Sequence, residues 1–204
     1  MELHLTSSEP YHTVLVAQSL KSSGSQREPT PMYHIHSPHH FNRKSTKISR
    51  IDPSVAHDAS YNFKGKKRSD IKDCEEYGSG VNEMARITWN TLSSSRIVFE
   101  GKILEVDQFM PRSGFLWCNR TFQGPDGLTY VWHNGSHLSL SVMRDGQKVE
   151  VVRFHEPFSF RKKPYLIVQE EAMHILDLVV ATWVFVATRK QEDERTSAAV
   201  AAAS

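Results

Sequence analysis

The sequence predicts a mainly β fold, a sandwich or barrel of roughly ten or eleven strands, followed by one hydrophobic helix near the C-terminus. Short segments rich in β-branched and aromatic residues recur between His12 and Gln169, and turn signals such as Gly124–Gly127 separate them. A continuous apolar segment, residues 175–188, then follows and is interrupted by a single acid, Asp177. We expect the burial of this segment to organise the rest of the molecule.

Alternation of apolar and polar residues indicates the individual strands. Ala85, Ile87 and Trp89 alternate with polar neighbours, which is typical of a half-buried strand. The segments on either side of Gly124–Gly127 form a predicted hairpin. Strands are expected over residues 12–17, 32–36, 44–51, 84–90, 96–100, 103–109, 117–122, 128–133, 138–142, 148–154 and 165–169.

The remaining segments define the domain limits. Residues 52–82 are polar, contain few apolar side chains and cannot build a core, so we expect a long, mobile and disordered loop. The small residues near the C-terminus indicate a flexible tail over 191–204. The sequence therefore predicts one domain over residues 1–190.

The apolar segment has three possible structures. As a membrane-spanning helix it is too short, because 175–188 would cover about 21 Å of an apolar layer about 30 Å thick. Composition alone supports a strand and a buried helix about equally. Glu170–Glu171 before the segment and Arg189–Lys190 after it match the helix dipole, and with the length they favour a helix. A helix that is apolar on nearly every side must be enclosed.

Composition narrows the classes of function. The 204 residues carry a formal net charge of +2, which does not support a nucleic-acid-binding domain. The N-terminus lacks the pattern of a signal peptide, and two cysteines, Cys74 and Cys118, are expected to be reduced thiols. We therefore expect a cytoplasmic protein that is not secreted and has no transmembrane segment, with a nuclear or peripheral membrane location as the alternatives.

Several segments together resemble an uncharacterised domain family found mainly in basidiomycete fungi, and the resemblance covers roughly residues 12–190. These segments are Ala85–Trp89, Ile97–Gly101, Arg120–Gly127 with Tyr130–Trp132, and Ile175–Asp177. The family is similar in pattern to the tubby-like and LURP-one-like superfamily, whose fold is a barrel of about twelve strands around a hydrophobic helix. The resemblance implies a roughly ten to twelve-stranded antiparallel barrel-like domain that encloses the C-terminal helix. It implies no catalytic residue and no cofactor.

Histidines supply the first candidate site. His34 and His36 would point to the same side of a strand, and imidazole suits zinc or copper. A tetrahedral site needs further ligands, however, and no cysteine or acid lies close by in the sequence. We therefore expect two solvent-facing histidines beside a loop and no bound metal.

Three basic clusters supply the second candidate site. Each is suited to anionic lipid headgroups, although each is also typical of a solvated loop. The expected anionic-ligand contacts are Arg43, Lys44, Lys64, Lys66, Lys67, Arg68, Arg161, Lys162 and Lys163, and Lys47 and Arg50 follow the first cluster.

The sequence contains no catalytic motif that we can recognise. No serine lies in a Gly-x-Ser-x-Gly motif, and Cys118 lies near Phe122 in a segment that resembles a packed strand, where a thiol is usually structural. The leading hypothesis is a non-enzymatic intracellular binding or scaffold domain that docks at anionic membranes. The alternatives are a nuclear regulatory or interaction protein and an enzyme whose site forms only in three dimensions.

Overall fold

The fold is known from a computed structural model that describes residues 1–18, 29–38, 44–58, 63, 79–90, 93–114, 118–144, 146–157 and 163–203. Within these residues, thirteen antiparallel strands form one sheet, in the order β7-β6-β5-β4-β3-β2-β1-β13-β12-β11-β10-β9-β8. The strands are β1 (Glu2–Leu5), β2 (Thr13–Gln18), β3 (Thr30–His36), β4 (Ser45–Ile51), β5 (Val81–Thr88), β6 (Arg96–Phe99), β7 (Lys102–Glu105), β8 (Arg112–Ser113), β9 (Asn119–Gln123), β10 (Thr129–Asn134), β11 (Leu138–Arg144), β12 (Gln147–His155) and β13 (Tyr165–Val168).

The sheet consists of two meanders, which are joined where the first strand pairs with the last. Every pairing links strands that are consecutive in the chain except that of β1 with β13, which unites the first and last strands. The two edge strands, β7 and β8, are connected by the short helix α1 (Val106–Phe109) and do not pair with each other. The predicted antiparallel, barrel-like β domain is therefore confirmed, with thirteen strands in a sheet that is not closed.

The strands form where apolar and polar residues alternate, and they end at residues that favour turns. The β6–β7 hairpin has a two-residue turn, Glu100 and Gly101, with φ angles of 48° and 75°. Positive φ at both positions matches a type I′ turn, whose twist suits a hairpin. The eleven expected strands all have counterparts, although the segment 103–109 ends as a strand at Glu105 and continues as α1. Strands β1 and β8 were not predicted.

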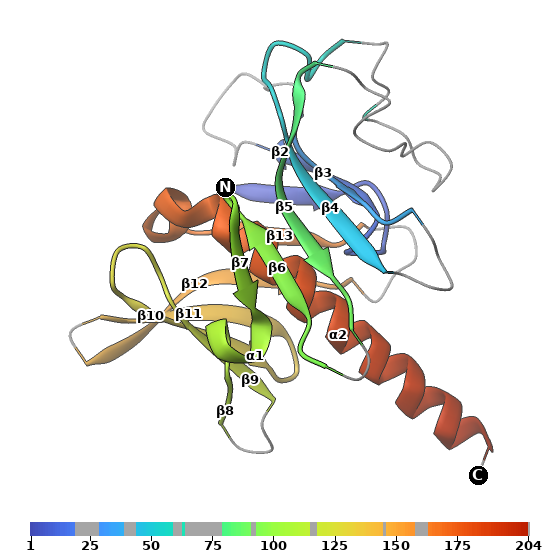
Figure 1. Ribbon diagram of the computed structural model, residues 1–204, viewed down its shortest axis with the longest axis vertical. Coiled ribbons are helices and arrows are strands. Elements are labelled where there is room, and N and C mark those ends of the chain that lie inside the picture. The colour runs from blue at the N-terminus through green and yellow to red at the C-terminus, as the bar shows by residue number, and fades with distance from the viewer. Residues whose placement is uncertain are drawn as a thin grey trace.

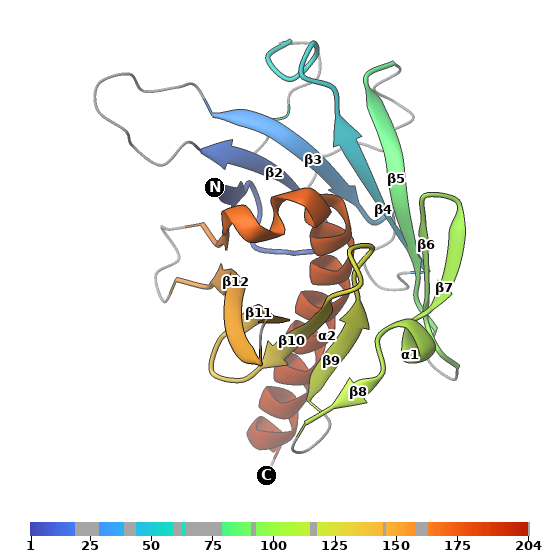
Figure 2. The same cartoon turned by 90° about the vertical axis from the view of Figure 1, so that its left-hand side faces the viewer.

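The apolar segment is a helix at the centre of the molecule. A 3₁₀ helix, Glu170–Ile175, leads into α2 (Leu176–Ala203), and residues 178–188 are all buried. The sheet curves around α2 in two perpendicular views (Figures 1 and 2). The predicted enclosure of the helix is therefore confirmed.

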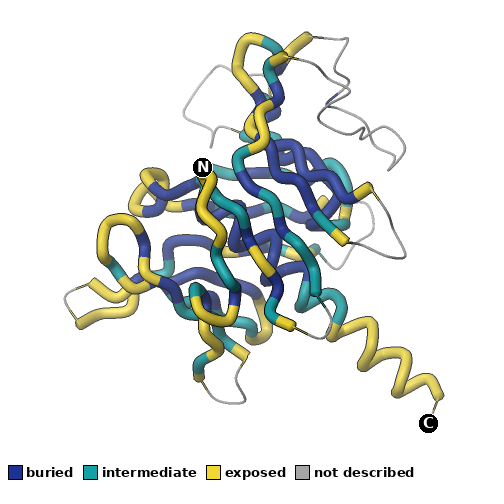
Figure 3. The backbone as a smooth tube through the Cα atoms, in the orientation of Figure 1, coloured by how far each residue is buried: buried dark blue, intermediate teal, exposed yellow. Residues whose placement is uncertain are grey.

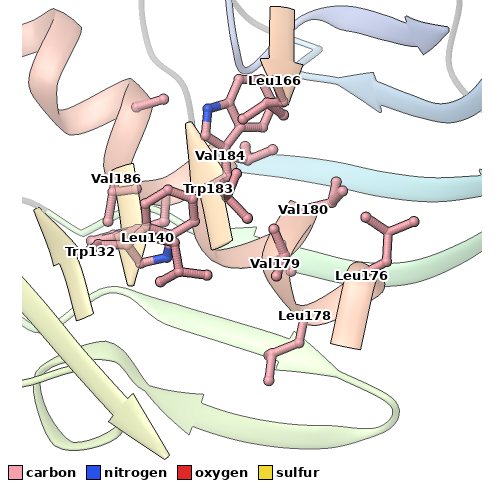
Figure 4. Close-up of a cluster of buried hydrophobic side chains, with 14 of the residues drawn as sticks. Trp132, Leu140, Leu166, Leu176, Leu178, Val179, Val180, Trp183, Val184 and Val186 are labelled. Atoms are coloured by element: carbon pink, nitrogen blue, oxygen red, sulfur yellow. The ribbon is translucent and has the colours of Figure 1, made fainter. Parts of the chain in front are cut away.

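Packing of this helix against the sheet forms the main core. Figure 4 shows Val179, Val180, Trp183, Val184 and Val186 of α2 close to Trp132, Leu140 and Leu166 of the strands. Trp183 is fully buried and makes an edge contact with Phe154, with ring centroids 5.3 Å apart. Burial of one large apolar side chain stabilises a fold by about 1.5–3 kcal/mol, so this helix contributes a large share of the stability.

The C-terminal end of α2 departs from the prediction. The helix continues to Ala203 and so includes residues 191–203 of the segment 191–204, in which a flexible tail was expected. Figure 3 shows these last turns exposed beyond the sheet. The alanines of this segment are strong helix formers, and the segment extends a helix that is already nucleated in the core.

The length and apolarity of this helix resemble those of a membrane span. The helical residues 170–203 are long enough and apolar enough to cross a membrane, but 78% of their most apolar window is buried inside the domain. The core helix of a folded domain can have the same length and apolarity, so the role of this helix in the core explains its composition.

A second hydrophobic cluster lies on the other face of the sheet. Val14 alternates with Leu15 of the main core and therefore points away from α2. It packs with Ile51, Ala56, Phe63 and Val81. The expectation that residues 52–82 form a loop that cannot build a core is wrong for Ala56, Phe63 and Val81, while 59–62 and 64–78 lie outside the described residues.

Candidate functional site

A large cavity lies where the sheet is open. Its volume is about 960 Å³, and its walls come from the β6–β7 hairpin, the β9–β10 hairpin, strands β3 and β4, and the start of α2. Protein interiors are normally packed without voids of this size. The apolar part of the wall is formed by Met32, Ile51, Phe99, Leu104, Phe109, Met173, Ile175, Leu176 and Leu178.

Asp177 anchors the polar side of this cavity. The Tyr33 hydroxyl donates to Asp177 Oδ1 over 2.6 Å, and Arg50 Nη2 donates to Asp177 Oδ2. The carboxylate lies in the first turn of α2, where the helix dipole favours a negative charge. The acid that interrupts the apolar segment is therefore held by two strands and faces the cavity.

The electrostatics of this group keep Tyr33 protonated. Burial raises the pKa of Tyr33, and the hydrogen bond to Asp177 acts in the same direction. The hydrogen bond to Asp177 also raises the pKa of Arg50. At neutral pH the group is thus a neutral phenol beside a carboxylate that is paired with a guanidinium.

A second polar group fixes the opposite wall. Asp126, in the β9–β10 turn, accepts from the Tyr130 hydroxyl over 2.8 Å and lies 2.8 Å from Nε2 of His174. Burial acts to raise the pKa of Asp126, but the bonds from His174 and Tyr130 outweigh it, so the pKa is lowered. This group ties the hairpin to the 3₁₀ helix and so holds one edge of the cavity in place.

The charged residues of the cavity balance each other. Arg50 and Lys102 are its arginine and lysine, and Glu100 and Asp177 are its acids. The two bases and two acids give no net charge when histidine is counted as neutral. The cavity as a whole therefore has no formal charge with which to select an anion or a cation.

Sequence reasoning found few of these residues. Asp177 was noted only as an interruption, and Arg50 was grouped with Arg43–Lys44. In the structure Lys44 precedes β4 and Arg50 lies near its far end, so the two are separated by nearly the whole strand. The signal that could have found the site was the single acid in an otherwise apolar buried segment, because such a charge needs partners.

The histidine candidates lie elsewhere. The rings of His34 and His36 are 6.1 Å apart between centroids, which agrees with side chains on the same side of β3. Both are buried, so the expectation of solvent-facing histidines is wrong. His34 pairs with Val14 across the strands and therefore lies on the sheet face away from α2. The rings of His12 and His36 are tilted relative to each other, with centroids 5.0 Å apart.

The metal prediction is not settled by this arrangement. Among the residues that the structure describes, no group of three or more His, Cys, Asp or Glu side chains is arranged to hold a metal. The expectation that His34 and His36 bind no zinc or copper thus stays a prediction.

Most of the basic candidates cannot be placed. Lys44 and Lys163 are exposed. Their role in binding anionic ligands stays a prediction. Outside the described residues lie Arg43, Lys64, Lys66, Lys67, Arg68, Arg161 and Lys162.

Cys118 also differs from its expected setting. It is an exposed residue just before β9 and is not packed inside the sheet. Its Sγ lies 3.6 Å from the side-chain oxygen of Asn119.

Comparison with known proteins identifies a family but no function. Residues 13–192 match the "Family of unknown function (DUF6593)". No curated protein and no solved structure matches the chain significantly.

Proposed function

Since the chain belongs to DUF6593, a family of unknown function, we propose from its geometry that it is a non-enzymatic binding domain for an uncharged, largely apolar small molecule. The observation that carries this proposal is the cavity of about 960 Å³ at the opening of the sheet. Ligand pockets in proteins have volumes of about 300–1,000 Å³ and are lined mainly by apolar side chains.

The apolar wall favours an apolar occupant. Side chains such as Phe99, Leu104 and Phe109 lose packing contacts when they border empty space, and such a void destabilises the fold. Removal of such apolar surface from water on binding favours an apolar molecule. A bound apolar molecule would restore these contacts.

The paired charges favour a ligand without net charge. Asp177 is already bonded to Arg50 and Tyr33, so an anionic headgroup would have to compete for the arginine. A hydroxyl or amide on the ligand can share these groups without that competition, because it adds no charge to bury. We therefore expect a neutral molecule with one or two polar atoms at the Asp177 side.

Nile red, a neutral dye whose fluorescence rises in apolar surroundings, tests the proposal. Leu104→Trp places a larger side chain in the cavity wall and is expected to weaken dye binding about tenfold, equivalent to about 1.4 kcal/mol. Ile103→Trp is the matched control, because Ile103 precedes Leu104 on the same strand, is 68% exposed and does not line the cavity. Saturable binding that is equal in both variants would rule the cavity out as the site.

A relationship to the tubby-like superfamily forms part of the proposal. It is supported by a single antiparallel sheet that curves around an apolar C-terminal helix. The unpaired edges β7 and β8 are a departure from a closed barrel. A fungal origin of the chain is proposed only from the sequence resemblance.

An intracellular location is proposed as well. It is supported by the apolar helix, because 78% of its most apolar window is buried inside the domain and is therefore not needed to span a membrane. Microscopy of a fluorescent fusion tests the location. Docking at anionic membranes, a nuclear role and an enzymatic role stay predictions from the sequence.

A further inference from the structure

A second hollow, smaller and more polar, lies further along α2 from the first cavity. Its volume is about 470 Å³, and its walls include Arg112 of β8, Arg120 of β9 and Arg189 of α2. We call it the arginine pocket. Ser93–Ser95, in the segment before β6, complete one side of it.

Arg189 is held firmly on aromatic rings. Its guanidinium carbon lies 5.2 Å from the ring centroid of Trp89 and 5.7 Å from that of Phe185. Its Nη2 donates to the Ser95 hydroxyl over 3.1 Å and to the Asn90 carbonyl over 3.3 Å. These contacts fix the position of the cation before any ligand arrives.

Arg120 is brought to the same place. Its guanidinium carbon lies 5.6 Å from the Phe185 ring centroid, so two arginines share one aromatic ring. Its Nη1 donates to Asp107 Oδ1 over 2.7 Å and to the Met110 carbonyl over 2.8 Å. The side chain is only 12% exposed.

The pocket is lined by three arginines whose charge is largely offset by nearby acids. Its lining has three arginines and two aspartates, Asp107 and Asp193, and Glu192 pairs with Arg189 beside it. Burial is the main cause that lowers the pKa of Arg189. Asp193 opposes this change, the nearby cations Arg120 and Arg112 add to it, and Asp107 opposes it again. An anion placed among the arginines would relieve this repulsion.

Donors in the pocket are still available. All hydrogen bonds of the Arg120 side chain to other described residues use Nη1, which leaves Nη2 and Nε. The Arg112 side chain is exposed and makes no hydrogen bond or ion pair with the described part of the chain. Guanidinium groups present paired N–H donors that match the oxygens of phosphate.

We propose that the arginine pocket binds a phosphate-type oxyanion, either free or as the phosphate group of a larger ligand, through Arg112, Arg120 and Arg189. This site is separate from the apolar cavity and takes a ligand of the opposite character. Leu104→Trp, which narrows the apolar cavity, is therefore expected to leave oxyanion binding unchanged.

Calorimetric titration of the full chain tests the proposal. The probes are inorganic phosphate, a soluble inositol phosphate, and phosphatidylcholine vesicles with or without a phosphoinositide. Arg112→Ala is expected to weaken binding about tenfold, in line with the loss of a charge-assisted hydrogen bond. Arg153→Ala is the matched control, because Arg153 is an exposed arginine on β12 outside the pocket, and it is expected to retain the affinity of the unaltered chain.

The arms of the titration separate the sources of phosphate. Saturable binding of the soluble compounds that is weakened in Arg112→Ala but not in Arg153→Ala supports a soluble ligand. Binding confined to the phosphoinositide vesicles, with the same loss, supports a lipid headgroup. The absence of saturable binding to any probe overturns the proposal. Equal losses in Arg112→Ala and Arg153→Ala also overturn it, because they would indicate attraction by overall charge.

Discussion

Trp132 donates its indole Nε1–H to the Thr182 hydroxyl over 3.0 Å and so joins the middle of β10 to the buried middle of α2. Thr182 in turn donates to the Leu178 carbonyl within the helix over 2.8 Å. Both residues are buried, so water cannot replace this bond. The pair therefore sets how the helix is oriented inside the sheet.

Replacement of Thr182 by valine tests the energetic weight of this bond. The substitution keeps the shape but leaves the Trp132 Nε1–H without an acceptor, and we expect a loss of about 1–3 kcal/mol in the free energy of unfolding. Urea denaturation measures the change. Thr196→Val is the matched control, because Thr196 makes the same type of bond to the Glu192 carbonyl but is exposed. A loss that is equal in the two variants would show that the buried bond has no special role.

Asp126 predicts a dependence of stability on pH. Its pKa is lowered in the folded chain, so its contribution to stability is complete above the unfolded value of about 3.9 and is lost as the pH falls through the lower folded value. The difference in unfolding free energy between the unaltered chain and Asp126→Asn is therefore expected to shrink as the pH falls below about 3.9. Tyr130→Phe, which removes one of the bonds that lower this pKa, should show a smaller dependence. A difference that is constant over this range would contradict the assignment.

A side chain at Gly101, in the β6–β7 turn, is expected to lower the stability of the fold. Gly101 has φ of 75°, and an added Cβ would meet no other atom within 4 Å, so any loss arises from the backbone alone. We expect Gly101→Ala to destabilise the chain by about 1–2 kcal/mol in thermal or urea unfolding. Gly135→Ala is the control, because Gly135 has equal space and an ordinary φ. If both variants are equally stable, the turn does not have the type I′ geometry.

The course of the chain was largely predictable from local pattern. Alternation in residues 84–90 and the turn at Gly124–Gly127 indicate a strand and a hairpin without any knowledge of distant residues. Strand β1 escaped prediction because its four residues are too short to show a clear period, and it is stabilised by β13, more than 160 positions away. Pairing between distant segments has no local signal.

The candidate site was hardly predictable. Arg50 and Tyr33 lie 127 and 144 positions before Asp177, and they meet it only because β3 and β4 cross the start of α2. The same holds for the arginine pocket, whose arginines lie at positions 112, 120 and 189. Grouping of charges by nearness in the sequence therefore pointed to clusters such as Lys64–Arg68 and passed over both cavities.

The sequence by itself determined that this protein is a strand-rich domain built around a buried helix, because an apolar surface on nearly all sides of a segment must be removed from water. The tertiary structure alone decided that the sheet stays open between β7 and β8, and which side chains border the opening. The physical reason is that burial depends on the composition of each segment, whereas a cavity depends on where segments from all parts of the chain fail to meet.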